Sequence, residues 1–84
     1  MFGLCMPSGD VYLVFKDGKK ENIMMTDLIS PRKEILENKY ILKSIKHYGY
    51  ENIDSIVYER HGHTSKVSMA EYYYENAKKL KEEI

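Results

Sequence analysis

Cysteine is almost missing from this sequence. Cys5 is the single cysteine among 84 residues, so no disulfide can form within the chain. A lone thiol is typical of proteins kept in a reducing compartment, and we therefore expect a cytoplasmic protein. Small domains without disulfides often gain stability from a second subunit. Composition alone thus predicts self-association, most simply as a homodimer.

Long hydrophobic runs are missing as well. No apolar stretch approaches the roughly 18 residues that a membrane-spanning helix needs, and no basic region precedes the apolar residues 1–7 as in a secretion signal. We therefore expect no membrane partner. Residues 1–9 are interpreted as a loose N-terminal arm or a short first strand.

Neither sign of charge is in excess. The chain has 13 basic and 13 acidic residues, for a formal net charge of zero. Nucleic-acid-binding proteins normally carry a basic stripe, because neutralising phosphates supplies most of their affinity. A nucleic-acid-binding regulator is therefore the second hypothesis, with tyrosines stacked on bases and Lys66, Lys78 and Lys81 on phosphates. All basic residues except Arg32 and Arg60 are lysines, a bias that suggests a bacterial or phage gene.

Two stretches predict β-hairpins. Residues 11–15 favour a strand, and Asp17-Gly18 after them is a strong hairpin signal, because both central residues of a type I′ turn need positive φ. Residues 20–25 are expected to return as a weaker edge strand. The second hairpin lies within residues 53–67, where a turn at 60–63 lets residues 64–67 return as a shorter partner strand. Residues 56–58 are predicted to form a strand covered on both faces.

Two helices complete the expected fold. The first begins with Ser30 as its cap and Pro31 at its first position and runs to Tyr48 before Gly49. Its apolar stripe is imperfect, so a strand over residues 39–48 stays an alternative. The second helix begins with a capping box from Ser68 to Glu71. Its predicted apolar stripe consists of Met69, Tyr73, Ala77, Leu80 and Ile84.

Together these elements predict one α+β domain over residues 1–84. The expected element order is ββαββα, with one antiparallel sheet and two helices.

Three consecutive tyrosines, Tyr72, Tyr73 and Tyr74, are the strongest indication of a binding surface. Successive helical residues are about 100° apart, so three rings cannot all face one core. Tyr73 belongs to the apolar stripe, and Tyr72 is predicted to point away from it. Exposed amphipathic rings are typical interface anchors. We therefore predict that all three bind a partner, and the leading hypothesis is a non-enzymatic protein–protein interaction or regulatory module without a cofactor.

Glu59, His61 and His63 are the strongest candidates for metal-dependent catalysis. Alternate residues of a strand share a face, and Zn²⁺ favours carboxylate and imidazole ligands. Gly62 lies between the histidines, where a turn would break that alternation. A structural turn is the preferred interpretation, and a metal-dependent enzyme is the third hypothesis.

Overall fold

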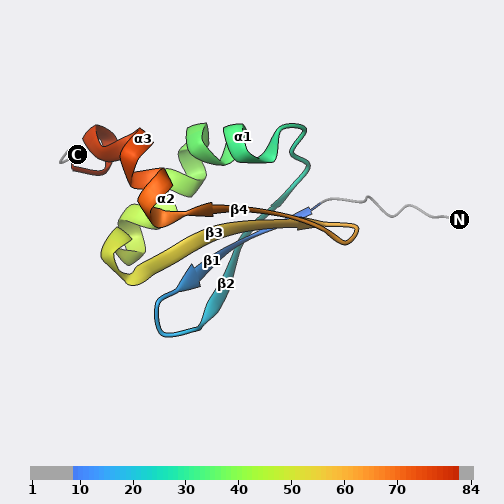
Figure 1. Cartoon of the computed structure of the whole chain (residues 1–84), viewed down its shortest axis with the longest axis horizontal. Helices are drawn as coiled ribbons and strands as arrows, with labels where there is room; N and C mark the ends of the chain where they lie inside the picture. The colour runs from blue at the N-terminus through green and yellow to red at the C-terminus, as the bar shows by residue number, and fades with distance from the viewer. Residues whose placement is uncertain (1–8, 82–84) are drawn as a thin grey trace, which may run out of the picture.

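The computed structural model describes residues 9–81, which form a four-stranded antiparallel sheet and three α-helices (Figure 1). The strands are β1 (Gly9–Phe15), β2 (Lys20–Thr26), β3 (Ile53–Arg60) and β4 (His63–Ser68), and the helices are α1 (Pro31–Glu37), α2 (Lys39–Tyr48) and α3 (Met69–Lys81), with a 3₁₀ turn η1 (Tyr50–Asn52). The strand order is β2-β1-β3-β4. The predicted α+β class is confirmed. The N-terminal arm expected over residues 1–9 lies outside the described residues except for Gly9.

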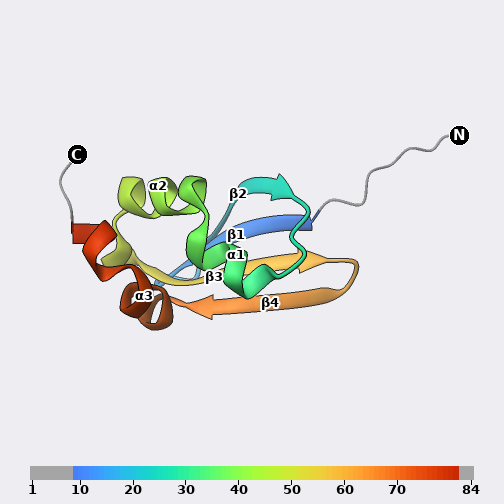
Figure 2. The ribbon, with the colours of Figure 1, turned by 90° about the horizontal axis from the view of Figure 1, so that it is seen from above.

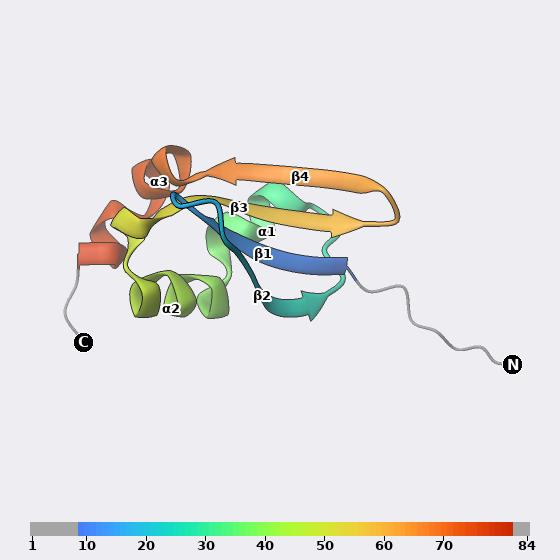
Figure 3. The same ribbon diagram turned by 90° about the horizontal axis from the view of Figure 1, so that it is seen from below.

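All three helices lie on one face of the sheet, and the view from below shows the strands of the other face in front (Figure 3). Side chains that alternate along the strands point toward the helices and are buried: Val11, Leu13, Ile56, Tyr58 and Val67. Each such side chain stabilises the fold by about 1.5–3 kcal/mol. No helix within residues 9–81 is long and apolar enough to cross a bilayer.

The two hairpin turns differ from each other. His61 and Gly62 have φ of 50° and 83° and join Arg60 to His63, as a type I′ turn requires. The turn predicted at residues 60–63 is therefore confirmed. The first hairpin is also present, but its type I′ turn was a wrong prediction. Only Gly18 of the Asp17-Gly18 pair has positive φ, since His61 is the one non-glycine with positive φ among the described residues.

The first helix begins where the sequence predicts, with Pro31 at its start. Ser30 precedes it, but its side chain makes no capping hydrogen bond within the described residues. Instead, the Ser30 backbone N–H donates to the Glu34 carboxylate at 2.7 Å. This contact satisfies the N–H of Ser30 itself and not the first N–H groups of the helix, so the predicted serine cap is wrong.

A break at Asn38 divides the single helix predicted up to Tyr48 into α1 and α2. Asn38 has an extended backbone (φ −75°, ψ 125°). Its Oδ1 accepts hydrogen bonds from the N–H groups of Tyr40 at 2.8 Å and Ile41 at 3.0 Å, which makes it the N-cap of α2. The change of direction explains the imperfect stripe, because Ile35 on α1 and Ile41 and Ile45 on α2 are each buried. Residues 39–48 are a helix, and the strand alternative is wrong.

α3 buries Met69 and Leu80 as predicted, but Tyr72 and Asn76 are buried where the predicted stripe has Tyr73 and Ala77. Its buried residues are Met69, Tyr72, Asn76 and Leu80, at spacings of three and four. The backbone leaves helical geometry at Asn76 (φ −123°, ψ 19°), where the side-chain amide donates to the Tyr72 carbonyl at 3.2 Å. Ile84, the last residue of the predicted stripe, lies outside the described residues. Tyr72 is fully buried, and Tyr73 is half-buried and packs against the edge of the core.

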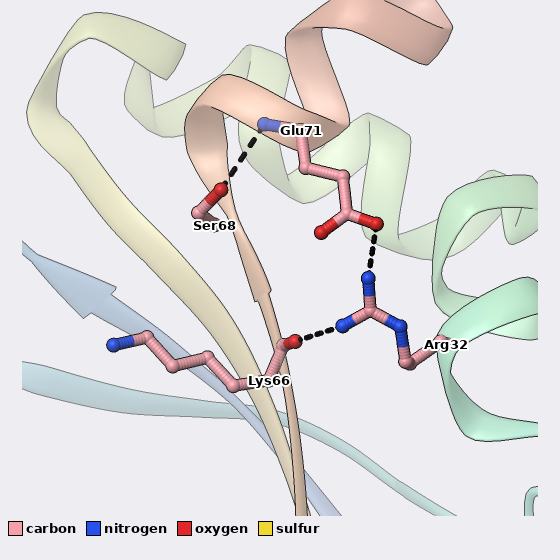
Figure 4. A network of polar contacts seen from close by, with 4 residues as sticks. All are labelled: Arg32, Lys66, Ser68 and Glu71. Atoms are coloured by element: carbon pink, nitrogen blue, oxygen red, sulfur yellow. Dashed lines mark hydrogen bonds and ion pairs between the residues drawn. The ribbon is translucent and has the colours of Figure 1, made fainter.

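Arg32 ties α1 to β4 and to α3 (Figure 4). Its Nη1 donates to the Lys66 carbonyl at 2.6 Å, and its Nη2 pairs with the Glu71 carboxylate. The Ser68 hydroxyl accepts from the Glu71 N–H at 3.1 Å, which confirms one half of the predicted capping box. The Glu71 carboxylate pairs with Arg32 and not with the Ser68 N–H, so the other half of the predicted capping box is wrong. An outward-facing carbonyl of an edge strand is thereby occupied.

Candidate interaction surface

Tyr50 and Tyr73 meet at the end of the sheet where α3 begins. Gly49 ends α2 with φ of 91°, and its N–H donates to the Ile45 carbonyl at 2.8 Å. The chain then enters η1, which brings the Tyr50 ring to Tyr73, with ring centroids 5.1 Å apart and planes inclined by 33°. Offset pairs of this kind contribute about 0.5–1.5 kcal/mol beyond area burial. The pair holds Tyr73 half-buried at the surface.

A hollow of about 510 Å³ adjoins this ring pair. Its apolar lining comes from Tyr50, Ile53, Met69, Ala70 and Tyr73. Lys16, Glu51 and Asp54 also line it, so charges of both signs border the apolar part. An apolar hollow with aromatic walls is suited to receive a large side chain of a partner.

The three predicted partner-binding tyrosines have different environments. Tyr74 is 83% exposed, and Tyr73 is half-buried against Tyr50. Tyr72 is fully buried, so the prediction that it points away from the core is wrong, and a partner cannot reach it. Its hydroxyl has no hydrogen-bond partner among the described residues, and burial raises the pKa of Tyr72 to about 12. The binding roles of Tyr73 and Tyr74 stay predictions.

The candidate metal ligands are not brought together. The sheet register pairs Glu59 with Thr64 and Arg60 with His63. Neighbouring pairs of a hairpin point to opposite faces, so Glu59 lies on the open face and His63 on the helix face. The reversal at His61-Gly62 thus breaks the alternation on which the hypothesis depends. Within residues 9–81 no cluster of three or more His, Cys, Asp or Glu side chains could hold a metal ion.

The two histidines instead border a pocket beside the linker between β2 and α1. It has a volume of about 340 Å³, and Arg60, Leu28 and Tyr58 also line it. The Arg60 guanidinium pairs with Asp27 at 3.0 Å. The sequence does not predict this pocket, because no local pattern indicates that residues near 28 contact the second hairpin.

A lysine crosses the open face of the sheet. Lys20 on β2 places its Nζ 4.3 Å from the centroid of the Tyr12 ring and 3.7 Å from the Glu59 carboxylate. Cation–π contacts of this kind at exposed sites contribute about 0.5–1 kcal/mol. The long side chain therefore partly covers the centre of this face, an arrangement that sequence spacing did not predict.

The lysines of the nucleic-acid hypothesis lie on separate elements. Lys66 is exposed on β4 and Lys78 is exposed on α3, while the side chain of Lys81 lies outside the described residues. Basic residues gather instead on α2, which contains Lys39, Lys43 and Lys46 and no acidic residue. The fold thus separates charges that the sequence interleaves.

Comparisons with known proteins add no precedent for these surfaces. No family model matches the chain, and no match was found among curated proteins or solved structures. We therefore infer function from the contacts, exposure and charge of the described residues.

Proposed function

We propose that this protein is a non-enzymatic protein–protein interaction module that self-associates as a homodimer. The contact is the tyrosine surface, defined as Tyr50, Tyr73 and Tyr74 with the adjoining hollow. The observation that carries the proposal is the apolar hollow of about 510 Å³ that Tyr50 and Tyr73 line, together with the 83% exposure of Tyr74, the next residue of α3. The single cysteine and the preference for lysine over arginine support a role in the cytoplasm of a bacterium or a phage-infected cell.

A two-fold arrangement suits this surface. In an isologous dimer the same patch meets itself, so Tyr74 of each copy enters the hollow of the other. The hollow is bordered by Lys16 and by the acidic residues Glu51 and Asp54. Two copies can therefore pair opposite charges around the aromatic centre, which favours one register of association.

The size of the chain supports association. A standard interface buries about 800 Å² on each partner, which is about one-seventh of the 5747 Å² accessible surface of this chain. A domain of this length has a small core and little margin of stability. Burying exposed rings against a second copy would further stabilise the folded state, because a single core of this size contributes little stability.

The test is analytical ultracentrifugation from about 1 to 500 µM with matched variants. Tyr74→Ala and Tyr73→Ala are expected to raise the dimer dissociation constant at least tenfold, since buried aromatic anchors carry most interface energy. Tyr40→Ala is the control, because Tyr40 is 71% exposed on α2. A monomer at every concentration would refute self-association. A dimer that all three substitutions leave unchanged would refute the tyrosine surface.

A nucleic-acid-binding regulator is the second candidate, and the charge of α2 favours it. Three lysines and the exposed ring of Tyr40 lie on this helix without an acidic residue. Binding to a single-stranded oligonucleotide would weaken steeply with salt, because released counterions set the slope. No retention at low ionic strength would remove this candidate.

A further inference from the structure

The two edges of the sheet differ in what lies beside them. At one edge, Arg32 of α1 occupies the Lys66 carbonyl of β4 (Figure 4). At the other edge, β2 borders a groove against α2. Figure 2 shows α2 on the β2 side of the molecule and α3 on the β4 side. Alternate N–H and C=O groups of an outer strand point away from the sheet and can pair with another strand. In β2 this alternation is regular on each side of Ile23, where the register with β1 shifts by one residue.

The groove has a volume of about 420 Å³. Glu21, Asn22 and Ile23 of β2 line one wall, and Lys43, Ser44 and His47 of α2 line the other. The Tyr48 ring holds the His47 ring edge-on, with centroids 5.0 Å apart and planes at 81°. A strand edge with a helix alongside is the arrangement that receives extended peptides in strand-addition complexes.

The charge of the helical wall selects the occupant. Lys43 is exposed and makes no ion pair within the described residues. α2 contains no acidic residue, and Glu21 is the one acidic side chain in the described lining of the groove. The α2 wall of the groove therefore favours a ligand that places negative charge next to Lys43 and away from Glu21.

We propose that this groove binds an extended segment of another protein, which adds to β2 as a fifth strand of the sheet. The segment carries acidic side chains at every second residue. Residues i and i+2 of a strand are about 6.7 Å apart on one face, and positions i and i+4 of a helix are about 6 Å apart along its axis. Two acidic side chains on one face of the segment thus match Lys43 and His47.

This site is separate from the tyrosine surface and does not depend on it. Backbone pairing along β2 requires an extended polypeptide, and a nucleic acid has no equivalent donors and acceptors for it. A second copy pairing through its own β2 would bring Glu21 and Met25 into the groove region, with one acidic residue per strand. An acidic segment of a different protein fits better, because it can pair its backbone with β2 and also place several carboxylates against α2.

The test is a titration of isotope-labelled full chain, followed by NMR. The probes are acetylated seven-residue peptides that alternate glutamate with valine, isoleucine or tyrosine. We expect shifts and slowed amide exchange along β2 and shifts at Lys43 and His47. Lys43→Glu is expected to weaken binding at least tenfold. Lys78→Glu, the same charge change on an exposed residue of α3, is expected to change it less than twofold, and Tyr74→Ala should leave it unchanged.

Several outcomes would overturn the proposal. These are the absence of shifts at about 1 mM of every probe, shifts confined to another surface, or equal binding by matched lysine peptides. Retained affinity of a peptide N-methylated on its pairing edge would exclude strand addition. Protection of β2 without any probe would assign the edge to a second copy. Displacement of the peptide by a single-stranded oligonucleotide, with a steep dependence on salt, would assign the groove to a polyanion.

Discussion

The Tyr58 hydroxyl accepts a hydrogen bond from the Leu28 N–H at 3.0 Å. It also donates to the Thr26 carbonyl at 3.3 Å, so one side chain of β3 holds the chain between β2 and α1. Leu28 and Tyr58 are both buried, so these groups have little access to water. The linker that positions α1 therefore depends on a residue 30 positions later in the sequence.

Removing that hydroxyl should destabilise the fold. Tyr58→Phe leaves the buried Leu28 N–H without its partner, and we expect a loss of about 1–3 kcal/mol in the free energy of unfolding. Urea denaturation measures the change. Tyr74→Phe is the matched control, since the Tyr74 ring is exposed, and should shift stability by less than about 0.5 kcal/mol. Equal effects of the two substitutions would contradict the role given to Tyr58.

Gly9 allows the close approach of the Tyr58 ring to β1. A Cβ atom at Gly9 would overlap the ring and hydroxyl of Tyr58. The Tyr58 ring cannot easily move aside, because its hydroxyl is hydrogen-bonded to both the Leu28 N–H and the Thr26 carbonyl. Gly9→Ala is therefore expected to cost about 1–3 kcal/mol, as overpacking in a core usually does. Thermal or urea unfolding measures the loss.

The control for this substitution is Gly62→Asn. Gly62 has φ of 83° with nothing near the position of an added Cβ, and asparagine tolerates the left-handed region. We expect a smaller loss there than at Gly9. If Gly9→Ala were as stable as the parent chain, the tight contact with Tyr58 would be disproved.

Stability at high pH should depend on Tyr72. Burial raises its pKa from 10.0 to about 12, so the folded state holds the phenolic proton more tightly than the unfolded state. The resulting stabilisation is complete below pH 10 and is lost as pH rises toward 12. Between these values we expect unfolding to become easier by on the order of 1–3 kcal/mol.

Tyr72→Phe isolates this effect from the other tyrosines. The variant loses a buried hydroxyl that has no partner among the described residues, so its stability at pH 7 should equal or exceed that of the parent. Its stability should also fall less between pH 9 and 11.5 in urea titrations. Parallel pH curves for the two proteins would show that Tyr72 does not ionise on unfolding.

Arg32 should protect the β4 edge. Arg32→Ala removes the hydrogen bond to the Lys66 carbonyl and the ion pair with Glu71. Because the arginine side chain is about half exposed, we expect a modest loss of about 1 kcal/mol. Arg32→Lys should recover only part of it, since a lysine lacks the planar fork that reaches two acceptors. Light scattering should detect more aggregation of the alanine variant as the edge opens.

The matched control is Lys33→Ala, which removes an exposed positive charge next to Arg32 on the same helix. It should change neither stability nor scattering appreciably. Similar aggregation of both variants would mean that net charge, and not the capped edge, governs solubility.

Short-range signals in the sequence predicted much of the fold. The turn at residues 60–63, the hairpin after residue 15, Pro31 at a helix start and the Ser68 cap all depend on residues within a few positions of one another. The backbone preferences of glycine and proline and the hydrogen-bonding reach of a serine hydroxyl act at that range. These features are therefore present in the sequence whatever the rest of the chain does.

The candidate surface was predicted only in part. Tyr74 lies exposed as the position of the three tyrosines suggested, but Tyr50, which lines the hollow with Tyr73, was not identified. Tyr50 and Tyr73 are 23 positions apart and share no periodic pattern. Their contact requires Gly49 to end α2 and β4 to place the start of α3 beside η1.

The amino-acid order by itself determined the α+β class and the positions of the turns, of a helix start and of the Ser68 cap. Only the tertiary structure decided which faces meet: Asn38 caps a new helix within a helical stretch, α3 buries Tyr72 in the core, and the hairpin sends Glu59 and His63 to opposite faces. The physical reason is that each local conformation has close competitors, and packing against distant segments selects among them.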